Sequence, residues 1–137
     1  MKIYFAGSIR AGRNDADIYL EIINHLKKYG EVLTEHVGNE QLSIKGEKGL
    51  SEKYIYDRDL EWLISSDVII AEVTTPSLGV GYEIRFAVEH NKKILCLYKP
   101  QEGKKLSAMV LGCPQITNVN YDSITEAKKI IDDFLKF

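Results

Sequence analysis

Residues 67–83 read DVIIAEVTTPSLGVGYE and give the clearest indication of the architecture. The first seven are almost wholly apolar, which is typical of a strand that helices cover on both faces of a parallel sheet. The residues that follow hold a proline, two glycines and three hydroxyl side chains before an amphipathic segment. We therefore predict a buried strand over 67–73, a loop over 74–80 and a helix over 81–91.

The same alternation of strand and helix continues on both sides of this unit. Apolar residues at helical spacing between 15 and 29, with Gly30 as the stop, predict the first helix. We expect strands at 2–6, 31–34, 67–73, 93–98 and 114–119, and helices at 15–29, 51–66, 81–91 and 123–136, with room for a short helix within 99–112. This pattern predicts an α/β fold: a doubly wound, flavodoxin- or Rossmann-like, five-stranded parallel sheet of order 2-1-3-4-5 with helices on both faces.

Length and composition indicate one globular domain over residues 1–137, with 45% apolar and 28% charged residues. The net charge of −2, from 18 basic and 20 acidic side chains, argues against a nucleic-acid polymer as partner, because binding to the phosphate backbone needs a basic face. No apolar run approaches the ~20 residues of a membrane helix. The first residues run straight into a strand rather than a signal peptide, so we expect a cytoplasmic protein, or a nuclear one in a eukaryote.

The cysteines and histidines predict neither a disulfide framework nor a metal site. Cys96 lies in an apolar run and is expected to be a buried structural thiol, and Cys113 is the only other cysteine. The three histidines, His25, His36 and His90, lie far apart and lack ligand spacing with the cysteines. We expect no metal and no other cofactor.

Two loops meet where the strand order of such a sheet reverses, between the strands at 2–6 and 67–73, and this is where ligands bind in this architecture. Both loops precede a helix, whose free N–H groups and positive dipole end suit an anion. Residues 7–10 offer backbone donors, a hydroxyl and a guanidinium, which suits a phosphate monoester. A tight turn with a surface arginine explains them equally, and they match neither a Walker loop nor Gly-x-Gly-x-x-Gly.

The second loop is more informative. Ser77 is expected to cap the helix that follows and to face a ligand, while Gly79 and Gly81 let a ligand approach the backbone. Glu83 is expected in the first turn of this helix, at the carboxyl edge of the sheet. Either it is a functional acid, or it is a glutamate placed favourably at the helix dipole.

Three further side chains are candidates at the same edge. Tyr4 is expected in the core, where its hydroxyl needs a partner, and Glu83 is a candidate. Asp59 shares a helix face with Trp62 and Leu63, so that desolvation would raise its proton affinity, whereas an ion pair with Arg58 or a lysine is the alternative. His36 closes the strand at 31–34, where it either contacts a ligand or caps the strand. The lysines at 45–48 and 104–105 are expected on the surface.

Taken together, these motifs resemble the 2'-deoxynucleoside 5'-phosphate N-hydrolase (Rcl) family of the nucleoside 2-deoxyribosyltransferase-like superfamily. The similarity covers nearly the whole chain, and PSLGVGYE at 76–83 is its most specific part. It departs most at 40–52 and after Cys113. The other matching segments are YFAGSIR at 4–10, LTEHV at 33–37, DLEWL at 59–63, AEVT at 71–74 and LSAM at 106–109.

The resemblance implies hydrolysis of the N-glycosidic bond of a deoxynucleoside 5'-monophosphate, giving a free base and 2-deoxyribose 5-phosphate. It implies Glu83 as nucleophile with a covalent glycosyl-enzyme intermediate, Tyr4 as its support and Asp59 as general acid/base. It also implies a homodimer in which Ser107 of the neighbouring subunit completes the phosphate site. The implied substrate-binding residues are Gly7, Ser8, Ile9, Arg10, His36, Ser77, Gly79, Ser107 and Met109, with Ser8, Arg10, Ser77 and Gly79 at the phosphate and Ile9 and His36 at the base.

Other functions stay open at this point. A nucleoside 2-deoxyribosyltransferase would pass deoxyribose from one base to another, although Ser8, Arg10 and Ser77 favour a phosphate over an uncharged hydroxyl. A non-catalytic nucleotide-binding module could use the same fold, which does not by itself decide activity. A ribonucleotide phosphoribohydrolase of the cytokinin-activating type has a longer glycine-rich motif than this chain carries.

Overall fold

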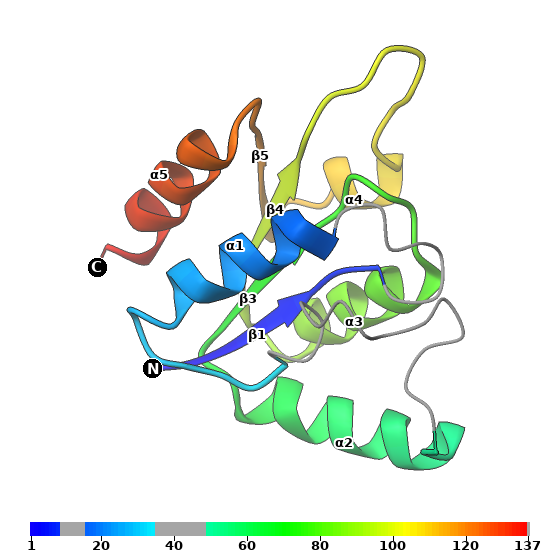
Figure 1. The fold of residues 1–137 in the computed structure, drawn as a ribbon. Coiled ribbons are helices and arrows are strands. Elements are labelled where there is room, and N and C mark those ends of the chain that lie inside the picture. The colour runs from blue at the N-terminus through cyan, green and yellow to red at the C-terminus, as the bar shows by residue number, and fades with distance from the viewer. Residues whose placement is uncertain (9–15, 35–48, 137) are drawn as a thin grey trace.

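A parallel sheet lies between two layers of helices in this computed structural model, which describes residues 1–8, 16–34 and 49–136 (Figure 1). The strand order is β2-β1-β3-β4-β5, and every neighbouring pair is parallel. The strands are β1 (Lys2–Ala6), β2 (Glu31–Val32), β3 (Val68–Glu72), β4 (Lys93–Tyr98) and β5 (Ile116–Asn120). The predicted fold class and strand order are therefore confirmed.

The central strand β3 pairs with β1 on one side and with β4 on the other. Ala6 and Ala71 are register partners at the ends of β1 and β3, so the loops that follow these two strands leave the sheet side by side. All five residues of β3 are buried, as the apolar sequence predicted for a strand covered on both faces. The reversal of strand order therefore lies between β1 and β3.

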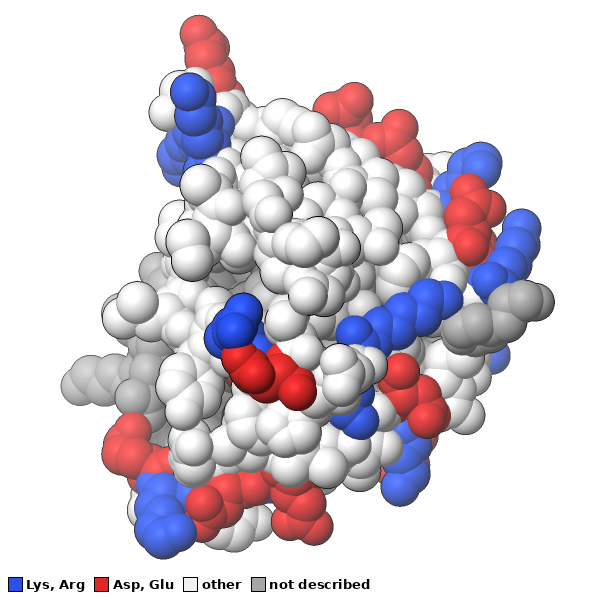
Figure 2. Space-filling view, turned by 180° about the vertical axis from the view of Figure 1, so that it is seen from behind, with Lys and Arg blue, Asp and Glu red and all other residues white. Residues whose placement is uncertain are grey.

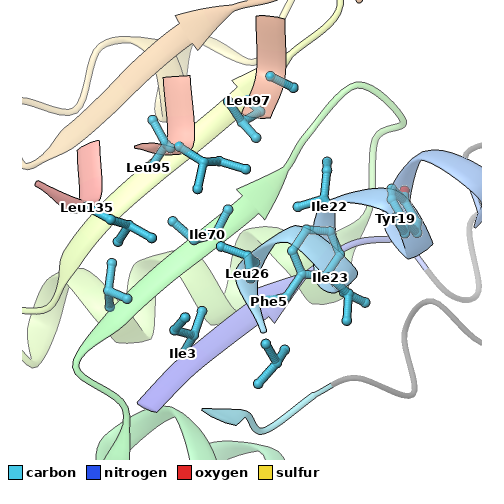
Figure 3. Close-up of a cluster of buried hydrophobic side chains, with 14 of the residues drawn as sticks. Ile3, Phe5, Tyr19, Ile22, Ile23, Leu26, Ile70, Leu95, Leu97 and Leu135 are labelled. Carbon is cyan, nitrogen blue, oxygen red and sulfur yellow. The ribbon is translucent and has the colours of Figure 1, made fainter. Parts of the chain in front are cut away.

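One face of the sheet is covered by α1 (Ala16–Leu26) and α5 (Ile124–Leu135), which lie side by side (Figure 1). Their apolar stripes pack on the outward-facing residues of the strands. Figure 3 shows this core, in which Ile22, Ile23 and Leu26 of α1 lie over Ile3, Phe5 and Ile70 of the sheet. This core holds most of the large buried aliphatic residues.

The other face is covered by α2 (Glu52–Ser65), α3 (Leu78–Glu89) and the short α4 (Ala108–Leu111). Its core contains Tyr4, Leu63, Ile84 and Cys96, which confirms Cys96 as a buried thiol. Here α2 lies beside β1, and α3 lies over β3 and β4. The two helices that carry Asp59 and Glu83 are thus neighbours on one face.

The third long helix begins earlier than its sequence predicted, at Leu78 rather than at residue 81. Ser77 is its cap: its hydroxyl accepts the N–H of Val80 at 3.3 Å and its carbonyl accepts that of Gly81 at 3.1 Å. The cap at Ser77 was predicted, but residues 78–80 had been assigned to the loop, and the capping bonds hold them in the helix. Glu83 consequently lies in the second turn, and its expected place in the first turn was wrong.

Smaller differences affect the ends of other elements. The second strand ends at Val32, because Thr34 turns its side chain back to bond the backbone of Phe5, and the fifth strand runs over 116–120 rather than 114–119. The first helix ends at Leu26, three residues before its predicted end at residue 29. Over the described residues, no helix is both long and apolar enough to cross a membrane.

Candidate active site

Tyr4 and Glu83 are joined by a side-chain hydrogen bond at the carboxyl edge of the sheet. Tyr4 lies on β1, is fully buried, and donates its hydroxyl hydrogen to Oε2 of Glu83 on α3. The predicted pairing of these two side chains is confirmed. Because 78 residues separate them in the sequence, only the adjacency of β1 and β3 brings them together.

Burial changes the proton affinity of both partners. It raises the pKa of Glu83 to about 7, since a charged carboxylate loses hydration there, and the nearby charge of Asp59 adds to this rise. The hydrogen bond from Tyr4 acts in the opposite direction, because it favours the ionised carboxylate. Burial likewise raises the pKa of Tyr4 far above its usual range, so its hydroxyl stays a donor. Glu83 is thus a carboxyl group poised to change charge near neutral pH.

Asp59 belongs to the same charged cluster. Its carboxylate raises the pKa of both Glu83 and Tyr4, which places its charge close to theirs. Its Oδ1 accepts from Nε of Arg58 at 3.0 Å and from Nη2 at 2.9 Å. The guanidinium in turn lies over the ring of Trp62, 4.6 Å from its centroid. The ion pair with Arg58, which the sequence left as an alternative, is therefore present, and it fixes the orientation of Asp59.

A tyrosine pair bridges the two helices that supply the acids. Tyr56 of α2 and Tyr82 of α3 have their hydroxyl oxygens 3.3 Å apart and their rings edge to face, with centroids 6.1 Å apart. Tyr82 directly precedes Glu83 in the sequence. This contact holds the N-terminal half of α3 against α2 and so helps to keep Glu83 near Asp59.

The loop after β3 presents an open helix N-terminus. A methyl group added to Gly79 would meet only Oγ of Ser77, at 3.9 Å, and one added to Gly81 would meet nothing within 4 Å. Neither glycine is needed for packing, nor does either have a positive φ. Open space over a capped helix start suits the close approach of an anionic ligand. Ser77 and Gly79 therefore lie at an open, capped helix start, and their role at a phosphate stays a prediction.

The loop after β1 is built differently. The backbone N–H of Ser8 donates to the hydroxyl of Tyr19 at 3.1 Å, and Ser8 is fully buried. A methyl group on Gly7 would lie 3.0 Å from two atoms of the Tyr19 ring. In this conformation Gly7 and Ser8 serve the packing of α1 against β1 and do not line an open site.

A wide groove lies beside the acid cluster rather than over it. It has a volume of about 1040 Å³ and runs between α3 and the segment 105–116. Ser77, Ser107 and Met109 line it, whereas Tyr4, Asp59 and Glu83 do not. Figure 2 shows this side of the molecule as a broad, mostly uncharged surface with few charged side chains near its centre. Ser107, which was predicted to complete the partner's site, and the predicted substrate contact Met109 thus share one groove with Ser77.

One buried polar cluster was not predicted as part of the site. Glu72 ends β3, is 1% exposed, and accepts hydrogen bonds from Thr74 and Tyr121. The available signal was a single glutamate inside an otherwise apolar strand, which the alternation pattern treated as part of that strand. Arg58 was named only as a partner of Asp59, and its stacking on Trp62 had no signal in the sequence.

Three predicted residues, Ile9, Arg10 and His36, lie outside the described part of the chain. Within residues 1–8, 16–34 and 49–136, the structure has no cluster of three or more histidine, cysteine or acidic side chains arranged to hold a metal ion. The site as described therefore consists of Tyr4, Asp59 and Glu83 at the sheet edge, with the open start of α3 beside them.

The fold and the site define a class of protein: an α/β protein with a partly buried acid cluster at the point where the strand order of its parallel sheet reverses. Residues 3–131 match the family model for nucleoside 2-deoxyribosyltransferase, and the chain belongs to that family. A curated relative from Esox lucius, named 5-hydroxymethyl-dUMP N-hydrolase, is 53% identical over 140 aligned residues that cover 99% of this chain and 97% of the relative. The protein of that name from Danio rerio is 60% identical over 112 residues, 82% of this chain and 78% of the relative.

Solved structures agree with the architecture. The CMP N-glycosidase BcmB of Clostridium botulinum superposes with a TM-score of 0.71 over 98% of this chain and 100% of that one. At 20% sequence identity this likeness bears on the fold alone. The family assignment rests on the sequence match, which includes the residues of the acid cluster.

Proposed function

We propose that this protein hydrolyses the N-glycosidic bond of 2'-deoxynucleoside 5'-monophosphates to a free base and 2-deoxyribose 5-phosphate. The observation that carries this proposal is the Tyr4–Glu83 hydrogen bond with Asp59 close by, at the ligand-binding edge of the sheet. Curated relatives at 53% and 60% identity carry the name of a nucleotide N-hydrolase, and this makes 5-hydroxymethyl-dUMP the first substrate to test.

The chemistry follows from two acids in different surroundings. The two acids compete for one proton, since the charge of Asp59 favours the protonated form of Glu83, and in the reactive form we place that proton on Asp59. Ionised Glu83 then attacks the anomeric carbon, the bond to the base breaks through an oxocarbenium-like transition state, and Asp59 gives its proton to the departing base. Asp59, now ionised, takes a proton from water, whose oxygen attacks the same carbon and releases Glu83. Tyr4 supports the first step, because its hydrogen bond favours the charged form of Glu83.

The 5'-phosphate would bind at the start of α3. Ser77 supplies a hydroxyl, and the open backbone at Gly79 lets the phosphate approach the positive end of the helix. Arg10 would add a charge-assisted bidentate contact. Ser8 would join this site only after its present burial is relieved. The base would lie toward Ile9 and His36, as the family resemblance implies.

The decisive experiment incubates the purified chain with deoxynucleoside monophosphates, ribonucleoside monophosphates and free deoxynucleosides, and follows the released base by chromatography. We expect base and sugar phosphate from the deoxynucleoside monophosphates alone. An exchanged nucleoside in the presence of a second base would identify a transferase. Binding of nucleotide without release of base would identify a binding module and contradict the proposal.

The role of Asp59 can be tested with substrates whose leaving bases differ in their need for a proton. We expect Asp59→Asn to slow base release by ~10²–10⁴-fold for an ordinary base, the usual contribution of general acid/base catalysis. With 7-methyl-2'-deoxyguanosine 5'-monophosphate, whose base leaves without protonation, the first turnover should be far less affected. An equal loss on both substrates in single-turnover experiments would contradict the acid role.

We propose that a second copy of this chain binds in the groove beside the acid cluster. The rim carries Leu78, which is 96% exposed, and Met109, which is 86% exposed, while the walls are mostly aliphatic. Such a surface is unusual on a monomer and is typical of a protein interface. A two-fold arrangement would set the same patch against itself and bring Ser107 of the partner toward the Ser77 loop.

Complementation tests this sharing of the site. Glu83→Gln and Ser107→Glu should each be inactive alone, the second because it sets a carboxylate against the phosphate. If Ser107 acts across the interface, a mixed dimer contains one intact site, and an equimolar mixture should recover about a quarter of wild-type activity. No recovery in a mixture shown to exchange subunits, or a monomer by sedimentation, would contradict the shared site.

A further inference from the structure

Glu72 is a buried acid that the proposed reaction does not use. It ends β3 on the face opposite Tyr4, and only 1% of it is exposed. Burying a carboxylate is costly unless hydrogen bonds replace its water. Here Oε1 accepts the backbone N–H of Thr74 at 2.8 Å, and Oε2 accepts the Thr74 hydroxyl at 2.8 Å and the hydroxyl of Tyr121. An aliphatic residue would fill this position in the core without needing hydrogen bonds. A glutamate whose two oxygens both accept hydrogen bonds here therefore suggests a role beyond packing.

Thr74 connects this acid to the neighbouring strand. While its hydroxyl donates to Glu72, the same oxygen accepts the backbone N–H of Lys99, which follows β4, at 2.9 Å. Tyr121 extends the connection to the segment after β5, where its own N–H donates to the carbonyl of Tyr98 at 3.0 Å. Residues just after β3, β4 and β5 are thereby tied to one carboxylate.

The tied residue is the first part of the loop that leads to the open helix start. Only Thr75 and Pro76 separate Thr74 from Ser77, so fixing Thr74 limits where Ser77 and Gly79 can lie. We propose that Glu72 is a positioning residue that, through Thr74, holds the β3–α3 loop in the geometry that binds the 5'-phosphate. This rests on the proposed function for the identity of the ligand, and on the described contacts for the mechanism.

The test compares two matched threonines. Thr74→Val removes the hydroxyl that joins Glu72 to Lys99. Thr34→Val is the control, because Thr34 is also buried and its hydroxyl also makes two hydrogen bonds. It accepts from N of Phe5 at 2.8 Å and donates to the Phe5 carbonyl at 2.6 Å. Each variant loses one buried donor and leaves one backbone N–H without its acceptor, so both should lower the melting temperature.

The readout is phosphate preference, the ratio of the Kd of a deoxynucleoside to that of its 5'-monophosphate, measured by calorimetry alongside kcat/KM. We expect Thr74→Val to lower this ratio at least ~10-fold and Thr34→Val to change it less than about twofold, since small displacements of positioning groups have large effects. Thr74→Ser, which keeps the hydroxyl, should restore the wild-type ratio. An unchanged ratio in Thr74→Val, or an equal fall in both valine variants, would overturn the proposal.

Two further measurements separate this inference from the proposed function. If the wild-type chain releases no base, the reaction is wrong, yet the Kd ratio still decides the role of Glu72. If Thr74→Val does not fold, Glu72→Gln takes its place: an amide nitrogen cannot accept a hydrogen bond, so one of the two bonded oxygens is lost, and the ratio should again fall. A wild-type ratio in a folded Glu72→Gln would overturn the positioning role.

Discussion

The loops that follow β1 and β3 both hold glycine and serine, yet a methyl group added to each would meet different surroundings. At Gly7 it would press on the ring of Tyr19 at 3.0 Å, whereas at Gly79 it would find only Ser77, at 3.9 Å. Ser8 is buried and bonded to Tyr19, whereas Ser77 caps an open helix. One loop uses its glycine to pack the core, and the other leaves space for a ligand, although their compositions look alike.

This comparison also separates stability from function. The segment formed by the β3–α3 loop and the start of α3 contains Glu83 and two glycines that packing does not require. Burial raises the pKa of this glutamate to about 7. Such features cost stability and are retained where a function needs them. In the described part of the loop after β1, by contrast, Gly7 packs against the ring of Tyr19 and the Ser8 N–H donates to the Tyr19 hydroxyl.

The largest expected effect is on catalysis and concerns the helix after the second loop. Glu83→Gln should lower turnover by about 10⁴-fold or more, because the nucleophile is removed, and should keep nucleotide binding measurable by calorimetry. Tyr4→Phe, on the strand before the first loop, should cost much less, since it only supports Glu83. A Glu83→Gln variant that releases base at the wild-type rate would contradict the assignment of Glu83 as the nucleophile.

The next effect is on stability and has a definite sign. Because the pKa of Glu83 is raised from 4.5 to about 7, its contribution to folding is fully present below pH 4.5 and declines as the pH rises through 7. Glu83→Gln lacks this decline. The difference in free energy of unfolding between the variant and wild type should therefore shift by about 3 kcal/mol in favour of the variant between pH 4 and pH 8.5. Urea unfolding at both pH values measures this, and a constant difference would show that Glu83 is not buried in this way.

A smaller loss is expected from a methyl group in the first loop. Gly7→Ala should cost about 1–3 kcal/mol, because the fully buried Tyr19 has no room to move away. The measurement is the free energy of unfolding in urea. A neutral result would mean that this glycine is not needed for packing, and the contrast between the two loops would then be lost.

The smallest effect has the opposite sign. Gly79→Ala should stabilise the chain by up to ~1 kcal/mol, since alanine is the better helix former and the added methyl group meets nothing closer than 3.9 Å. It should nevertheless weaken binding of a deoxynucleoside monophosphate. Gly81→Ala is the matched variant for the gain in stability. Destabilisation by both alanines, or unchanged nucleotide affinity in Gly79→Ala, would count against an open ligand site at this helix.

Much of this architecture could be predicted from local pattern. The apolar run ending in Val73 predicted a doubly covered strand, and the hydroxyl of Ser77 before a helical segment predicted its cap. The start of α3 could not be predicted, because glycine has a low helix propensity. The capping hydrogen bonds of Ser77, which outweigh this low propensity, are visible only in the structure. The end of β2 could not be predicted for a similar reason, since the side-chain hydrogen bonds of Thr34 replace further strand pairing there.

The candidate site divides in the same way. The residues Tyr4, Asp59 and Glu83 could be named from motif and resemblance, and the Tyr4–Glu83 contact followed from the expected strand order. Glu72 was missed, because a lone acid in an apolar strand is informative only when its hydrogen-bond partners are known, and these come from Thr74 and from the distant Tyr121.

The sequence by itself determined the order of strands and helices, the sheet topology and the chemical types at its carboxyl edge, because hydrophobic period and capping residues act over a few positions. Only the tertiary structure decided which glycine packs and which stays open, that Arg58 holds Asp59, and that Glu83 is buried enough to titrate near pH 7. These properties depend on distances between segments far apart in the chain, and hydration and Coulomb forces respond to those distances rather than to order along the sequence.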